Sequence, residues 1–180
     1  MLKRIVIVLL IVVSLSLQSC TPAALNLKSY SNTLKGYEFL YPNGWVQVKV
    51  ENGPDVVFHD LIEEKENISV VINPIPAEKN LANLGTPTDV GYRLSKNVIA
   101  PPGSGRDAEL ISAASRQVGD MTYYLLEYAI QLPNQVVRHN LTNAVIRRGQ
   151  LFTCSLYTSE DRWQKSESLF RQVINSFSVY

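Results

Sequence analysis

Hydrophobic and polar residues alternate along most of the second half of the chain, with a period of two residues. Four such stretches cover residues 108–118, 121–132, 135–146 and 150–158. Turn-forming residues separate them, at Gly119-Asp120, Pro133-Asn134 and Arg147-Arg148-Gly149. Alternation interrupted by short turns of this composition is typical of antiparallel strands joined as hairpins. The pattern therefore predicts a four-stranded antiparallel unit.

The first half of the chain carries shorter alternating stretches. They cover residues 37–41, 45–50, 56–62 and 68–72. The turn sequence Pro42-Asn43-Gly44 lies between the first two, which predicts that they pair as a hairpin with an aromatic rim. Turn-forming or charged residues separate the others. We expect the four stretches to form an antiparallel meander.

Two stretches have the period of a helix instead. The first begins at Thr86, which is followed by a proline and by Asp89 at the spacing of a capping box. Val90, Leu94 and Val98 then recur every four residues on one face. The second helix begins at residues 159–161, where acidic residues suit the helix dipole. Its large apolar residues share one face: Trp163, Phe170, Ile174 and Phe177.

The order of these elements is strands, helix, strands, helix. This order indicates the α+β class, in which helices cover an antiparallel sheet. Residues 123–130 carry apolar side chains on both faces of the predicted strand, so both faces are expected to be buried. We therefore predict an α-β-α sandwich with a central antiparallel sheet.

The first twenty residues have the pattern of an export signal. Two basic residues precede an apolar run from Ile5 to Leu17, which is shorter than the roughly 20 residues of a membrane span. The run ends in Leu17-Gln18-Ser19-Cys20, which resembles the lipobox of bacterial lipoproteins. We expect residues 1–19 to be a signal peptide, 20–30 a lipidated flexible spacer that starts at Cys20, and 31–180 the folded domain. The alternative is a secreted protein cut near Ser19, with Cys20 an idle thiol.

Composition narrows the class of protein further. The chain has 17 basic and 16 acidic residues, which does not favour a nucleic-acid partner. Cys154 is the only cysteine besides Cys20, so no disulfide is expected within the domain, and its alternating strand context predicts a small core residue. The sequence contains none of the common nucleophile or metalloprotease motifs. We predict that the protein is not an enzyme.

Two histidines are the candidates for metal binding. His59 and Asp60 lie beside further carboxylates, and imidazole with carboxylate suits zinc, whereas carboxylates alone suit calcium or manganese. Neighbours on a strand point to opposite faces, however, so a solvated strand edge is the competing interpretation. We expect no required cofactor, and at most a weakly bound divalent ion at His59, Asp60 or His139. Arg138, Arg147 and Arg148 are the candidates for docking an acidic partner surface, the alternative being solvated turns.

Several blocks of the sequence resemble the PsbP family. They are Tyr37–Trp45, Asp55–Asp60, Glu66–Ile72, and the stretch from His139 through Phe152 to the Trp163 helix. The resemblance covers about residues 30–180. It implies a PsbP-like α-β-α fold, similar to that of Mog1, and a monomer associated with photosystem II on the lumenal side of the thylakoid membrane. The lipobox points to the cyanobacterial branch, because the plant members lack it.

In that branch, the resemblance implies a lipid-anchored extrinsic accessory protein that contacts lumenal subunits or assembly intermediates of photosystem II. Its role would be to support assembly or stability of the oxygen-evolving complex. The basic N-terminal extension with which plant relatives help to retain calcium and chloride has no counterpart in residues 21–30. The alternative is a lipoprotein carrier that binds a metal ion or small molecule in the lumen or periplasm.

Overall fold

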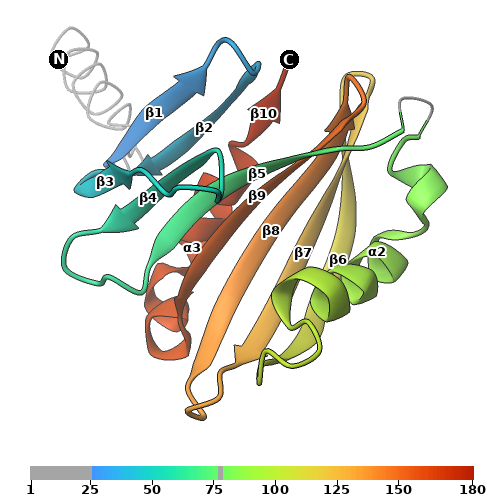
Figure 1. Cartoon of the computed structure of the whole chain (residues 1–180). Helices are drawn as coiled ribbons and strands as arrows, with labels where there is room; N and C mark the ends of the chain where they lie inside the picture. Colours follow the sequence, from blue (N-terminus) through green and yellow to red (C-terminus); the bar gives the residue numbers. More distant parts are fainter. Residues whose placement is uncertain (1–25, 77–78) are drawn as a thin grey trace, which may run out of the picture.

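A seven-stranded antiparallel sheet forms the centre of the domain, in the strand order β3-β4-β5-β9-β8-β7-β6 (Figure 1). The computed structural model describes residues 26–76 and 79–180. The leader and Cys20 lie outside the described residues. The strands are β3 Trp45–Val48, β4 Val56–Asp60, β5 Asn67–Pro74, β6 Asp107–Val118, β7 Met121–Gln131, β8 Val137–Arg147 and β9 Gln150–Ser159.

The four long strands predicted for the second half are confirmed as β6 to β9. Each pairs antiparallel with the next one along the chain. A bulge between Leu110 and Ser112 shifts the register of β6 against β7. The β8–β9 turn places Arg148 and Gly149 at positive φ, as tight two-residue hairpins require. Alternating apolar residues and turn residues were sufficient here because all three connections are local.

A second, three-stranded sheet was not predicted. Its order is β1-β2-β10, with β1 Leu27–Asn32, β2 Tyr37–Pro42 and β10 Ser178–Val179. The predicted hairpin between residues 37–41 and 45–50 is therefore wrong, because β2 pairs with β1 and β10 while β3 pairs with β4 in the large sheet. Pro42 ends β2 at this change of sheet. The predicted meander survives only as β3-β4-β5.

The folded domain also begins earlier than expected. The spacer was placed at residues 20–30 and the domain at 31–180, yet β1 pairs along its whole length with β2, from Leu27 opposite Pro42 to Asn32 opposite Tyr37. This strand was missed because it is a half-exposed edge strand in which only Leu27, Tyr30 and Asn32 are partly covered.

The first helix, α2 Pro87–Leu94, has the predicted capping box: Thr86 and Asp89 exchange side-chain and backbone hydrogen bonds. Its buried face departs from the prediction after Leu94. A π turn at Ser95–Ile99 closes with the Ala100 amide donating to the Ser95 carbonyl, five residues back. This wider turn leaves Val98 65% exposed and buries Ile99 in its place. A 3₁₀ turn at Ala82–Leu84 precedes α2.

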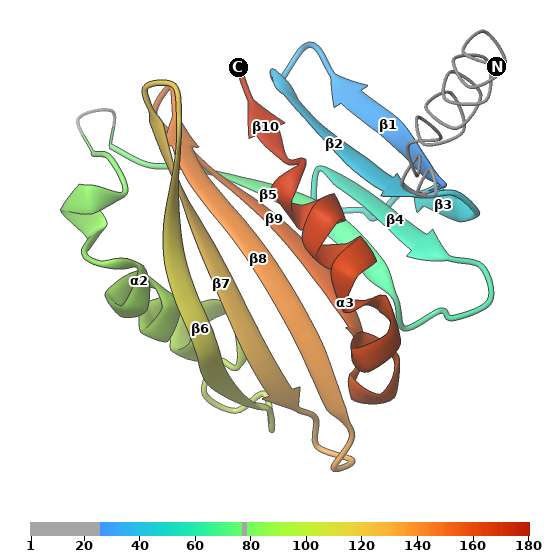
Figure 2. The ribbon, with the colours of Figure 1, turned by 180° about the vertical axis from the view of Figure 1, so that it is seen from behind.

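The two helices cover opposite faces of the large sheet. Helix α2 packs on β6 and β7, whereas α3 Glu160–Asn175 packs on β8, β9 and β2 (Figures 1 and 2). The small sheet lies on the same face as α3 (Figure 2). The α+β class and the predicted α-β-α sandwich are therefore confirmed. None of the helices in the described ranges has both the length and the apolarity of a membrane span.

Two apolar cores result, one on each face. The core between α2 and the sheet contains Tyr124, Leu126 and Tyr128 of β7. The core on the α3 face joins the helix, both sheets and Cys154, which is fully buried. Burial raises the pKa of the Cys154 thiol far above its usual range. The prediction that Cys154 is a core residue is confirmed.

The packing of the small sheet on the large one can be tested at Phe39. This side chain is 1% exposed, and its ring lies 5.9 Å from that of Phe58 in an edge-to-face arrangement. We expect Phe39→Ala to lower the free energy of unfolding by about 3–5 kcal/mol, because it leaves a cavity between the sheets. Urea denaturation monitored by circular dichroism measures the loss.

Glu38→Ala is the matched control, because Glu38 is exposed on the other face of the same strand. We expect this variant to change stability by less than about 0.5 kcal/mol. Equal losses of stability from both substitutions would contradict the packing of Phe39 between the small sheet and the large one.

Candidate functional site

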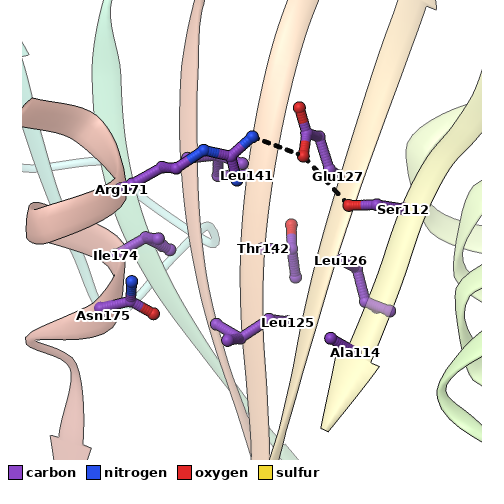
Figure 3. Close-up of a pocket in the computed structure, with 10 residues that line it drawn as sticks. All are labelled: Ser112, Ala114, Leu125, Leu126, Glu127, Leu141, Thr142, Arg171, Ile174 and Asn175. Carbon is purple, nitrogen blue, oxygen red and sulfur yellow. Dashed lines mark hydrogen bonds and ion pairs between the residues drawn. The ribbon is translucent and has the colours of Figure 1, made fainter. Parts of the chain in front are cut away.

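A groove runs beside α3, over strands β6 and β7. It exists because α3 covers only β8 and β9 of the four long strands. Its volume is about 140 Å³. Figure 3 shows its lining, with a floor of mixed polarity from β6, β7 and β8 and a wall from α3: Ser112, Ala114, Leu125, Leu126, Glu127, Leu141, Thr142, Arg171, Ile174 and Asn175.

Glu127 is the charged residue of the floor, and it is only 6% exposed. Its carboxylate accepts a hydrogen bond from the Ser112 hydroxyl at 3.0 Å and from the Arg171 guanidinium at 2.9 Å (Figure 3). The Nε2 atom of His139 lies 2.9 Å from its other oxygen. Residues of three strands and one helix thus meet at a single carboxylate.

His139 lies between two carboxylates. Its Nδ1 atom is 3.1 Å from an oxygen of Glu160, the first residue of α3. A neutral imidazole can donate from only one nitrogen, so only the doubly protonated ring donates to both Glu127 and Glu160. The ring also stacks on the Trp163 indole, with centroids 3.8 Å apart, and the Arg171 guanidinium lies 5.1 Å from the centroid of that indole.

A second buried carboxylate, that of Glu66, binds α3 nearer to its N-terminal end. Glu66 is 2% exposed and accepts hydrogen bonds from the Thr158 hydroxyl at 2.7 Å and from Nε of Arg162 at 2.6 Å. Two arginines of α3, nine residues apart in sequence, therefore each bind a carboxylate of the sheet. This arrangement holds the helix in one position on the strands.

The pKa of Glu127 reflects opposing effects. Burial alone would raise it, but hydrogen bonds from Arg171, His139 and Ser112, together with the charge of Arg171, lower it below the usual range. A depressed folded-state pKa means that Glu127 stabilises the fold at pH values above the ordinary carboxyl range. That contribution is lost as the pH falls through the folded-state value.

The three expected metal ligands do not form one site. His59 and Asp60 point to opposite faces of β4, and no group of three or more metal-binding side chains occurs in residues 26–76 and 79–180. Asp60 faces the α3 side and is occupied structurally, because it accepts hydrogen bonds from the Trp45 indole and from the backbone N–H groups of Ile62 and Glu63. His139 already has a carboxylate at each nitrogen. Zinc binding at a single histidine stays a prediction, which calorimetric titration before and after His59→Ala and His139→Ala tests.

The three expected docking arginines do not share one surface either. Arg147 and Arg148 lie at the β8–β9 turn, where Arg147 pairs with Asp120 at 3.0 Å and Arg148 donates to the Lys35 carbonyl at 2.6 Å. Arg138 lies near the other end of β8, nine residues and therefore roughly 30 Å away along the strand. Its guanidinium donates to the Lys65 carbonyl.

Sequence reasoning missed the buried carboxylates and their arginine partners. One signal was present: Glu127 is the only charged residue within the apolar strand from Met121 to Gln131. A lone charge at that position needs a partner when the strand is buried on both faces. The partner itself was not readable, because Arg171 is 44 residues further along the chain.

The contribution of Glu127 can be measured by its dependence on pH. We expect Glu127→Gln to lower the free energy of unfolding by about 2 kcal/mol at neutral pH, because charge-assisted hydrogen bonds to a buried carboxylate are lost. The difference from the unsubstituted protein should shrink as the pH falls below 4, where protonation removes the same interactions. Urea denaturation at a series of pH values checks this.

Glu109→Gln serves as the control, since Glu109 is an exposed carboxylate on the neighbouring strand β6. It should have little effect at any pH. A Glu127→Gln variant with an unchanged acid-side loss of stability would show that Glu127 is not the group responsible.

Comparison with known proteins places the chain in a family. Residues 25–179 match the PsbP family model. The chain is 46% identical to CyanoP of Thermosynechococcus vestitus over 184 residues, which covers 100% of both chains. It is 35% identical to PsbP-like protein 1, chloroplastic, of Arabidopsis thaliana, over 83% of this chain and 63% of that protein.

Solved structures agree with this assignment. The solution structure of cyanobacterial PsbP (CyanoP) from Synechocystis sp. PCC 6803 superimposes with a TM-score of 0.75 at 49% identity, covering 92% of this chain and 99% of the other. The family model and the end-to-end relatives agree with the resemblance seen in the sequence and with the α-β-α architecture of the structure. The chain therefore belongs to the PsbP family.

Proposed function

We propose that this protein is a lipid-anchored extrinsic accessory protein of photosystem II. It works on the lumenal side of the thylakoid membrane and supports assembly or stability of the oxygen-evolving complex without catalysing a reaction. The observation that carries the proposal is the end-to-end similarity to a cyanobacterial PsbP relative, at 46% identity over the whole of both chains. A match of this extent includes the leader as well as the domain.

The structure supports a docking role through its use of charged residues. Glu66 and Glu127 are buried on the α3 face, and each accepts a hydrogen bond from an arginine of that helix. The buried His139 lies 3.1 Å from Glu160 of the same helix. These groups stabilise the domain. A folded body of fixed shape is what an accessory protein presents to a larger assembly.

A lipid at Cys20 would keep the domain close to the bilayer. Strand β1 begins at Leu27, so the seven residues from the thiol to the domain reach at most about 25 Å when fully extended. Tethering raises the effective concentration of the domain near membrane partners, so that a weak docking surface is sufficient. Two or more acyl chains give stable anchoring.

Anchoring is tested at the cysteine. We expect Cys20→Ser to abolish incorporation of labelled fatty acid and to release the protein from washed membranes, because the acceptor thiol is gone. Cys154→Ala is the matched control, since this buried cysteine cannot reach lipid and its variant should stay acylated. Labelling that persists in Cys20→Ser, or an unacylated protein that stays membrane-bound, would contradict the anchor.

Docking is tested by co-purification. After mild detergent solubilisation of thylakoids, an affinity-tagged protein should co-purify with photosystem II subunits or assembly intermediates. Cross-linking with mass spectrometry then identifies the subunits contacted. The carrier alternative predicts that the protein runs alone with a metal ion or small molecule bound, and that outcome would overturn the docking role.

A further inference from the structure

A second cavity is lined by residues near the end of the large sheet where β7 passes into β8, on the face that carries α2. Figure 1 shows this end of the sheet and the position of α2. Its volume is about 220 Å³. Apolar walls come from the π turn, from β7 and from the residue after β7: Ile99, Ile130 and Leu132. Its polar lining comes from four different segments: Asn67, Arg106, Arg138 and Tyr157.

Two arginines line this cavity, and neither forms an ion pair within the described parts of the chain. Arg138 is half-buried, and its guanidinium lies 5.3 Å from the centroid of the Tyr157 ring. The guanidinium donates to the Lys65 carbonyl, but its Nε atom is buried and has no partner in the described chain. Arg106 is exposed and joins the lining from the segment before β6.

Among the described residues, no carboxylate forms an ion pair with Arg138 or favours its charged form. Burial lowers its pKa, and the nearby positive charge of Arg106 lowers it further, whereas the group that favours its charged form is the Tyr157 phenol. Arg162 and Arg171, the two arginines of α3 that bind carboxylates of the sheet, have the acidic partner that Arg138 lacks. A half-buried guanidinium with an unpaired N–H donor lowers the stability of the fold unless an anion compensates its charge.

We propose that this cavity binds the carboxylate of an acidic segment of a partner protein. The planar guanidinium fork matches the two oxygens of a carboxylate, and Arg106 and the Tyr157 hydroxyl supply further donors. The apolar walls suit the methylene stem of a glutamate or aspartate side chain better than a fully hydrated inorganic anion. Binding of a carboxylate would be the chemistry by which the accessory protein docks. The identity of the partner protein rests on the proposed function.

The placement of the site explains why Arg138 differs from the other two candidate docking arginines. Arg147 has an acidic partner within the chain, and Arg148 is bound to a carbonyl of the β1–β2 turn. Arg138 has a buried Nε donor without a partner in the described chain, a second cation beside it and a place in the lining of the cavity. We therefore assign partner binding on this surface to Arg138 and Arg106.

The first experiment uses the full chain carrying Cys20→Ser and follows backbone amides by NMR. N-acetylglutamate amide is the probe, and N-acetylglutamine amide is its uncharged counterpart. We expect saturable shifts at Tyr157, Ile130 and Arg138 with the first probe and none with the second. Affinity should fall with added salt, because the interaction is between charges near the surface.

Two variants and a control make this titration decisive. Arg138→Gln and Arg106→Gln should each weaken binding about tenfold, which is the effect of losing one charge-assisted hydrogen bond. Arg106 is exposed, so its variant tests the site without disturbing the fold. Arg93→Gln removes the same charge from the exposed side of α2 and should leave binding unchanged.

Other outcomes would overturn the proposal. Equal weakening by Arg93→Gln would reveal a general charge effect instead of a site. Saturable binding of inorganic phosphate, with no response to N-acetylglutamate amide, would show that the cavity takes a different class of anion. Lack of any saturable shift would remove the site altogether.

A second experiment separates this proposal from the proposed function. This experiment repeats the co-purification from thylakoids with lipidated protein. The double variant Arg106→Gln and Arg138→Gln should recover fewer photosystem II subunits than the unsubstituted protein, whereas Arg93→Gln should recover as many. Undiminished recovery by the double variant would overturn the docking role of the cavity. If the unsubstituted protein recovers no subunits, the proposed function fails, and the titration with the probe still decides whether the cavity binds carboxylates.

Discussion

Attachment of the C-terminal helix to the sheet is the interaction on which the rest of this fold depends. Helix α3 buries Trp163, Phe170, Val173 and Ile174 against β8 and β9, and the chain then continues through Phe177 into β10. Strand β10 completes the small sheet by pairing with β2, and the backbone of Val179 donates to the Tyr123 hydroxyl. Helix α3 therefore covers one face of the large sheet and is followed directly by β10, the strand that connects the small sheet to it.

Buried charges determine where that helix lies. Apolar contacts alone permit small shifts along a sheet, because hydrophobic burial has no direction. The pairs Glu66–Arg162 and Glu127–Arg171 have fixed donor and acceptor geometry, and a buried pair broken by a shift leaves a charge uncompensated. The exposed part of each arginine limits what the pair adds to stability. We infer that the two pairs mainly fix the position of α3.

The helices are offset on the two faces, and this offset creates both cavities. Because α3 covers β8 and β9, a groove stays open over β6 and β7, and its polar end is filled by the Glu127 network. On the opposite face α2 covers β6 and β7, and the π turn after it closes over the end of the sheet beside Arg138. On the α3 face, Glu66 and Glu127 are paired with arginines of the helix, whereas the opposite face presents two guanidinium groups without carboxylate partners in the described chain.

Local patterns were enough to predict the parts of the fold that local interactions determine. The capping box at Thr86 and Asp89, the hairpins from β6 to β9, the burial of Cys154 and the apolar face of α3 each depend on residues close together in sequence. The order of the elements gave the α-β-α class, because a strand that is apolar on both faces needs cover on both. The order of sequence blocks also indicated the family.

Tertiary structure alone decided the pairing of distant segments. Strand β2 pairs with β10, which follows α3 at the far end of the chain, instead of with β3, which is its neighbour in sequence. The Glu66–Arg162 pair joins residues 96 positions apart, and no spacing rule predicts such a partner. The proximity of Arg106 to Arg138 likewise depends on the loop after the π turn. Sequence therefore determined the elements and their buried faces, whereas the sites depend on long-range contacts that form only when those faces pack.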